Sequence, residues 1–301
     1  MTDLVIATLC SASIALVFKL GARRGLSGPW TITANYAVAF VAGLLIAGGQ
    51  AAFQEGPRAG LPSFLGSVPG VLGSGGSFEA GVTPLWGISM GVLAGILYLL
   101  GFLCYQKSVR ENGMALSGSF GKLGILVPVL ASVLVWGEIP RPLPSLGVAV
   151  ALASIVLSLE LRLPGRRGAG AGLMLLFLVG GLAEFCNKIY SRYAFPGLQG
   201  VFLASVFGTA LLLSIPRLRG RSPRGADLLA GLALGIPNVL ASQFLIRALG
   251  ALPAPVAFSV YGAGSMLLMN ATGVFVFGER LTARQKLAVF STAASLVLVS
   301  M

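Results

Sequence analysis

Two segments of this 301-residue chain, 141 positions apart, follow the same pattern. Trp136-Gly137-Glu138 and Phe277-Gly278-Glu279 each introduce an apolar run, and residues 137–157 match residues 278–298 at eight positions. Each copy reads as an aromatic-Gly-Glu turn followed by a closing hydrophobic helix, so the repeat predicts two related halves. In a sequence this apolar, such repeats are typical of transporters whose site lies between the halves.

The composition is that of an integral membrane protein. Hydrophobic residues make up 56% of the chain and charged residues 10%, with a mean hydropathy of +0.90. A soluble domain carries about 25% charged residues, so this chain lacks the groups that keep a surface in water. The 42 glycines fit close helix packing in lipid.

The same composition argues against several functional classes. The chain has no histidine, its three cysteines are scattered through apolar runs, and it has only nine acidic residues. We therefore predict no metal site, no cofactor and no enzymatic activity. The net charge of +12 arises from basic clusters between apolar runs, which suits lipid headgroups better than nucleic acid.

Apolar runs of about 20 residues, long enough to span a membrane, occur ten times. They cover residues 3–20, 30–50, 84–106, 114–136, 143–161, 169–190, 198–215, 226–247, 254–277 and 283–300. Five precede the basic linker at 162–167 and five follow it. We therefore predict an all-α membrane protein of ten transmembrane helices in two inverted five-helix repeats, residues 1–162 and 163–301.

Two interruptions stand out between and within these runs. Residues 51–83 form the longest stretch expected to be non-helical, either an interfacial flap or, as we favour, an insertion without fixed structure. In the eighth run, Pro237 predicts a break in the helix.

Basic residues in short loops predict the orientation of the chain. Loops after odd-numbered runs hold fifteen lysines and arginines, and loops after even-numbered runs hold five. This bias predicts that both termini lie outside the cytoplasm. We expect the protein to lie in a bacterial cytoplasmic (inner) membrane.

The pattern resembles the drug/metabolite transporter (DMT) superfamily, in its ten-helix EamA-type branch. The resemblance rests on the five-plus-five runs, on Gly137-Glu138 and Gly278-Glu279, and on Thr282-Ala283-Arg284-Gln285 at the start of the last run. It implies transport of amino acids, sugars, nucleotide-sugars or other small metabolites. It also implies termini inside the cell, opposite to the charge count.

Two charged side chains lie well inside predicted spans, where charge is costly and usually faces a cavity or a partner. Lys122 is near the middle of the fourth run and Glu184 is inside the sixth. Either the two pair with each other, or Lys122 binds an anionic substrate group while Glu184 meets an amine or carries a proton. Lys19 and Lys188 are expected to extend to the membrane interface instead.

Uncharged polar side chains provide further candidates, although ordinary helix–helix hydrogen bonding would also explain each of them. The predicted binding residues, besides Lys122 and Glu184, are Asn35, Tyr98, Asn187, Asn238, Gln243 and Tyr261, with Ser11, Ser259 and Ser265 among the other polar groups in the runs. We expect Lys122 to face a central polar cavity with Tyr261 and Asn187 in its walls. Glu138 and Glu279 are expected to cap the next helix.

These observations favour a secondary transporter of small polar metabolites, amino-acid-like or organic anions, working by alternating access. A sugar or nucleotide-sugar transporter of the same fold is the alternative, followed by a non-transporting membrane scaffold or sensor. The expected partners are a small-molecule substrate and the lipid bilayer. Coupling to protons or to exchange stays open, as does the choice between monomer and homodimer.

Overall fold

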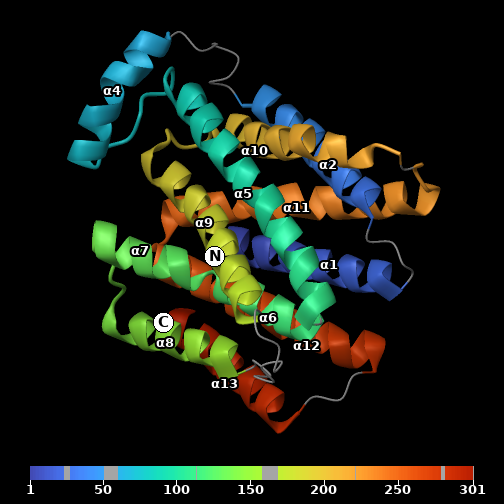
Figure 1. Ribbon diagram of the computed structural model, residues 1–301. Coiled ribbons are helices and arrows are strands. Elements are labelled where there is room, and N and C mark those ends of the chain that lie inside the picture. The colour runs from blue at the N-terminus through green and yellow to red at the C-terminus, as the bar shows by residue number, and fades with distance from the viewer. Residues whose placement is uncertain are drawn as a thin grey trace. The chain divides into compact units, whose positions relative to one another are not determined.

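The computed structural model describes residues 1–23, 28–50, 60–112, 114–157, 169–220, 222–278 and 282–300 (Figure 1). Within these ranges every regular element is a helix. They are α1 (Thr2–Arg23), α2 (Pro29–Gly48), α4 (Leu61–Ser74), α5 (Thr83–Asn112), α6 (Met114–Leu123), α7 (Leu126–Trp136), α8 (Pro142–Leu157), α9 (Ala169–Tyr193), α10 (Gln199–Ser214), the 3-10 helix η1 (Ile215–Leu218), α11 (Gly225–Ala251), α12 (Ala254–Phe277) and α13 (Ala283–Ser300).

Each of the ten predicted runs coincides with helical structure. Six helical segments are long and apolar enough to cross a membrane: Pro29–Gly48, Thr83–Ser108, Ala171–Tyr193, Gln199–Leu218, Gly225–Ala251 and Ala254–Phe277. The other four runs contain the shorter apolar segments Thr2–Ile14, Phe120–Trp136, Pro142–Leu157 and Lys286–Val299. The chain is therefore a helical membrane protein, while ten spans in two inverted repeats stay a prediction.

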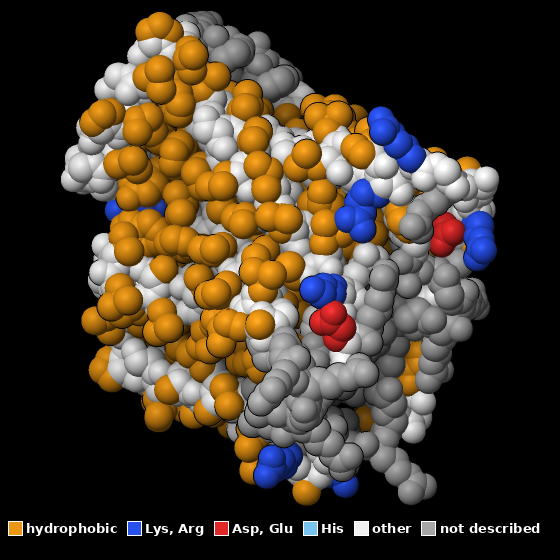
Figure 2. All heavy atoms as spheres, viewed as in Figure 1, with side chains coloured by type: hydrophobic (Ala, Val, Ile, Leu, Met, Phe, Trp, Pro, Cys, Tyr) orange, Lys and Arg blue, Asp and Glu red, His pale blue; other side chains and the backbone are white. Residues whose placement is uncertain are grey.

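The outer surface agrees with this conclusion. Large hydrophobic side chains are widely exposed, among them Leu134 at 82%, Phe275 at 87% and Phe290 at 74%. Figure 2 shows hydrophobic side chains over much of the face that it presents. Apolar surface on this scale marks a membrane or partner interface rather than a surface in water.

The fourth predicted run is divided into two helices. α6 ends at Leu123 and α7 begins at Leu126, and the Gly124 and Ile125 amides bond three residues back, to Gly121 and Lys122, at 3.3 and 3.4 Å. Pro128 provides the physical reason, because it has no N–H to donate to the Gly124 carbonyl and its ring crowds that carbonyl. The predicted single continuous helix over residues 114–136 is therefore wrong at this point.

The expected non-helical stretch 51–83 is wrong for residues 61–74, which form α4. Pro62 lies in the first turn, where its missing N–H has no helical partner to lose. Gly75 ends the helix in the left-handed conformation, with φ 68°. Residues 51–59 lie outside the described ranges.

The predicted break at Pro237 is also wrong. α11 continues as a helix from Gly225 to Ala251 with Pro237 inside it. A single proline removes one intrahelical hydrogen bond, and neighbouring helices can compensate for this loss within a membrane.

By contacts, the chain divides into two compact units. Unit 1 comprises residues 1–12, 100–185 and 251–301, and unit 2 comprises residues 13–99 and 186–250. Each unit takes segments from both predicted repeats, so the contact units do not coincide with the division at 162/163. That division stays a prediction.

In unit 1, α12 packs against α7, α8 and α13, and α8 and α13 lie side by side (Figure 1). The repeated aromatic-Gly-Glu motif ends α7 and α12 in the same manner. Gly137 and Gly278 are left-handed, with φ 63° and 65°, and their amides donate to Val133 and Val274 at 3.0 and 3.1 Å. A left-handed C-cap favours glycine, which explains why the repeat keeps this residue.

In unit 2, α2 packs along α10 through small residues. A β-carbon at Gly43 would lie 2.8 Å from the Ala204 backbone nitrogen, so only glycine allows this approach. Buried aromatic rings fill the interior beside it, including Tyr190 and Phe202, whose rings stack with centroids 4.2 Å apart.

Candidate functional site

Lys122 lies at the carboxyl end of α6, next to the break before α7. Discontinuous helices of this kind recur at the substrate and ion sites of transporters, because they bring backbone dipoles to a point inside the membrane. A cation is also favoured at a helix C-terminus, where the dipole is negative.

The Lys122 ammonium group has defined neighbours in unit 1. It donates a hydrogen bond to the Ser11 hydroxyl of α1 at 3.0 Å, and it lies 5.5 Å from the centroid of the Tyr261 ring on α12. A hydrogen bond to a charged group contributes about 1.5–3 kcal/mol and a desolvated cation–π contact about 2 kcal/mol. These contributions are comparable with the cost of about 2.5–3.5 kcal/mol for placing a charge in a membrane helix.

Glu184 belongs to the same group, because it interacts electrostatically with Lys122. Close contact between α9 and the α6–α7 junction brings Glu184 to this part of unit 1. A β-carbon at Gly181 of α9 would lie 2.6 Å from the Gly124 carbonyl oxygen, so α9 meets the α6–α7 junction almost backbone to backbone. Glu184 follows about one turn after Gly181. We refer to Lys122, Ser11, Tyr261 and Glu184 as the lysine cluster.

Two serines of α12, Ser259 and Ser265, are buried, and Ser265 extends this polar region. Ser265 lies four residues after Tyr261 and therefore on the same side of the helix. The hydroxyls of Ser265 and Ser259 are fully buried and make no hydrogen bond within the described part of the chain. Buried polar atoms are usually paired, so these hydroxyls can accept or donate a bond to a small polar ligand or to water.

A second polar group lies in unit 2. The Asn238 amide donates to the Asn35 carbonyl oxygen at 3.2 Å, and the Asn187 amide donates to the Tyr98 hydroxyl at 3.2 Å. The Tyr98 hydroxyl is also 3.4 Å from the Ser242 hydroxyl. We call these five residues the asparagine cluster. It joins α2, α5, α9 and α11 through uncharged hydrogen bonds.

Gln243 is next to this cluster in sequence. Its side-chain carbonyl oxygen is buried and accepts no hydrogen bond within the described ranges. An unsatisfied acceptor of this kind is costly in an apolar interior, so the Gln243 side chain has the capacity to accept a hydrogen bond from a ligand.

The predicted site residues therefore fall into two sets. Lys122, Glu184 and Tyr261 come together in unit 1, and Asn35 meets Asn238 and Tyr98 meets Asn187 in unit 2. The expectation that Asn187 shares a cavity with Lys122 stays a prediction, because the two belong to different units.

Lys188 was misjudged from the sequence. It was expected to extend to the membrane interface, but its side chain is only 3% exposed. The sequence held no signal for this burial, because a lysine near a helix end can extend outward or point inward. An ionisable residue buried within a span is a functional candidate by default. The side chain of Lys19, the other lysine expected at the interface, lies outside the described residues.

Glu138 caps the amino terminus of α12. Its carboxylate accepts a hydrogen bond at 2.8 Å from the backbone N–H of Ala254, the first residue of α12. Its expected role at the start of the next helix, α8, which begins at Pro142, stays a prediction. An acidic side chain is favoured at a helix N-terminus by the dipole. Glu279 lies outside the described residues.

Comparison with known proteins supports the fold alone. A solved crystal structure, described only as that of a protein, matches with a TM-score of 0.67 and 17% identity, over 99% of this chain and 95% of that chain. No protein-family model matches the sequence. No curated protein matches it either.

Proposed function

We propose that this protein is a secondary transporter of small polar metabolites, of the ten-helix EamA-type DMT kind, with an amino-acid-like or organic-anion substrate. Its two inverted repeats would alternate the access of a central site. It would have no catalytic residues and no cofactor, and its energy would come from an ion gradient or from exchange.

The lysine cluster is the observation that carries this proposal. A cation at a helix break, an acidic group that acts on it, a tyrosine ring and hydroxyls together provide complementary groups for a zwitterion. The substrate's carboxylate would take the place of Ser11 at the Lys122 ammonium. Its amine would meet Glu184 or the Tyr261 ring, since aromatic faces attract cations.

A sugar or nucleotide-sugar substrate is the second candidate, and the asparagine cluster favours it. Amide and hydroxyl side chains such as Asn35, Asn238 and Tyr98 both donate and accept hydrogen bonds. A sugar hydroxyl can replace any one of these contacts without a charged partner. The scaffold or sensor alternative has no comparable observation in its favour.

Uptake into vesicles tests the proposal. The purified full chain is reconstituted and exposed to labelled amino acids, organic anions, sugars and nucleotide-sugars, with protein-free vesicles as the control. We expect saturable uptake of a charged metabolite, competed by its unlabelled form. Uptake confined to sugars would favour the second candidate, and no uptake of any compound would count against transport of these classes.

A further inference from the structure

Helix α4 carries an apolar face that the proposed transport function does not use. Its fourteen residues contain no charged side chain. Leu61 and Leu65 are each 59% exposed and Leu72 is 44% exposed. With 3.6 residues per turn, these three leucines lie within roughly 40° of one another. They form one continuous stripe, which we call the leucine face.

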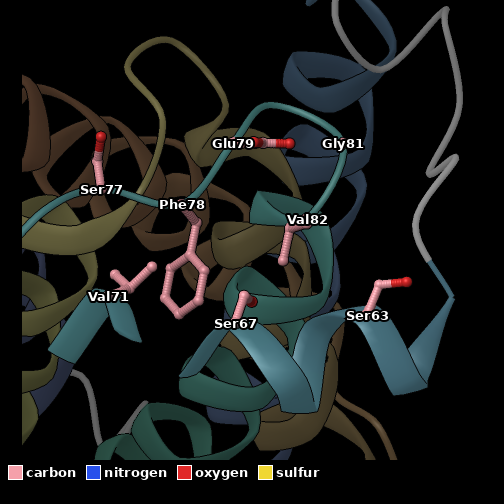
Figure 3. A pocket seen from close by; sticks show the side chains of 8 residues that line it. All are labelled: Ser63, Ser67, Val71, Ser77, Phe78, Glu79, Gly81 and Val82. Atoms are coloured by element: carbon pink, nitrogen blue, oxygen red, sulfur yellow. The ribbon is translucent and has the colours of Figure 1, made fainter. Parts of the chain in front are cut away.

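The opposite side of α4 is polar. Ser63, Ser67 and Ser74 lie on the other side of the helical wheel from the leucine face. Ser63 and Ser67, with Ser77 and Glu79, line a pocket of about 540 Å³ between α4 and the segment 77–82 (Figure 3). An apolar stripe opposite a polar one is the pattern of a helix that lies in a membrane interface.

The residues that hold α4 indicate its depth in the membrane. Phe64 is its buried anchor and packs on Phe78 with ring centroids 5.9 Å apart, and Phe78 packs on Trp86 at 5.0 Å. Trp86 in turn meets Tyr193, over whose ring the Arg192 guanidinium lies at 5.7 Å.

Trp86 is near the beginning of one candidate span and Tyr193 is at the end of another. Tryptophan, tyrosine and arginine at span ends mark the boundary between lipid and water. The anchor of α4 is therefore at interface level in unit 2.

The composition of α4 also indicates that this helix needs stabilising contacts with its surroundings. Gly66, Gly70, Gly73 and Pro69 are poor helix formers, and isolated helices of this length are marginal in water. Phe64 is its one buried residue. Burial of the leucine face in lipid would provide the missing stabilisation. Side chains of α5 such as Ile88 and Val92 are also apolar and exposed, at 45% and 42%.

We propose that α4 is an interfacial helix, with the leucine face embedded in the membrane among the acyl chains next to the headgroups and the serine side turned towards water and the pocket. The occupant of the leucine face is lipid. This inference depends on the membrane character of the chain and is independent of what the protein transports.

Spin labelling in vesicles tests this placement. Cys10, Cys104 and Cys186 are replaced by alanine in the full chain, and nitroxides are attached at Leu65→Cys and, as the matched control, Ser63→Cys. Phosphatidylcholine–phosphatidylglycerol vesicles carry the protein. Collisions with oxygen, which partitions into lipid, and with a water-soluble nickel chelate are compared. The label at Val92→Cys on the exposed face of α5 is the lipid reference.

We expect the oxygen-to-nickel accessibility ratio at Leu65 to be several-fold higher than at Ser63 and to approach that at Val92. Equal nickel accessibility at Leu65 and Ser63 would overturn the proposal, because α4 would lie in water. Protection of Leu65 from both reagents would overturn it as well, because protein would cover the face. The pair Leu72→Cys and Ser74→Cys repeats the comparison at the other end of α4 and decides the matter if one variant fails to fold.

Discussion

At the scale of single residues, the main finding is how the buried charges are accommodated. Lys122 has a hydroxyl, an aromatic ring and an acidic group around it, so its charge is compensated at a point where the helix is interrupted. Lys188 is a second buried lysine, 3% exposed, beside the asparagine cluster. Under the proposed transport function, both lysines are candidates for binding an anionic group of the substrate.

Replacement of Lys188 tests its role. Lys188→Met keeps the apolar stem and removes the charge, so a binding or coupling role predicts that transport falls by about tenfold or more, equivalent to about 1.4 kcal/mol. Lys107→Met is the matched control, because Lys107 is exposed near the end of a span. Initial rates of uptake into vesicles provide the measurement. Equal rates in both variants would mean that the buried charge is structural only.

At the scale of the elements, glycines set the distances between helices. Gly181 allows α9 to meet the α6–α7 junction and brings Glu184 towards Lys122. Gly43 likewise allows close approach of the α2 and α10 backbones. In lipid the interior of the bundle gains little from the hydrophobic effect, so close packing of small residues is what holds neighbouring helices together.

Gly181→Ala should therefore be destabilising. The added β-carbon would lie 2.6 Å from the Gly124 carbonyl oxygen and 2.7 Å from the Val127 β-carbon, and overpacking of this kind costs about 1–3 kcal/mol. Gly70→Ala is the control, since nothing lies within 4 Å of its added carbon. Thermal unfolding in detergent is compared for both. A Gly181→Ala protein as stable as the control would show that α9 can move away without penalty.

The sequence was sufficient to locate the helices but not their irregularities. Apolar length alone predicted helical structure at all ten runs. Two prolines inside apolar runs differ in their effect on the helix. The helical run is interrupted before Pro128, between α6 and α7, whereas α11 continues through Pro237. The difference depends on the neighbouring helices, which a linear pattern does not contain.

Among the candidate site residues, charge inside a span singled out Lys122 and Glu184 from the sequence, and the charge of Glu184 acts on Lys122 in the structure, while their role in binding stays a prediction. The exposure of Lys188 could not be predicted, because a lysine near a helix end either extends outward or points inward according to the rotation of the helix. Helix α4 was missed since its glycines and prolines suggested a loop, and its anchor Phe64 depends on the distant Trp86 and Tyr193 through Phe78.

At the scale of the whole molecule, each compact unit combines segments from both predicted repeats. The repeat accounts for the identical glycine caps at Gly137 and Gly278. An odd number of spans in each repeat would give the two repeats opposite orientations, an arrangement found in many secondary transporters.

The loop charges predict that both termini lie outside the cytoplasm. An engineered Thr2→Cys, in a chain whose three native cysteines are replaced, should react with a membrane-impermeant maleimide on intact cells. Labelling that appears only after the membrane is opened would place the amino terminus inside. The fifteen-to-five bias would then not determine the orientation, and the orientation implied by the family resemblance would hold.

The central claim is that Lys122 binds the substrate of a transporter, and Lys122→Met in the vesicle uptake assay tests it most directly. Methionine keeps the bulk of the stem and removes the charge. We predict folded, membrane-inserted protein with uptake at the background of protein-free vesicles, and no recovery when Glu184→Gln is added. If uptake returns in the double variant, Lys122 only neutralises Glu184, and the substrate-binding role is contradicted.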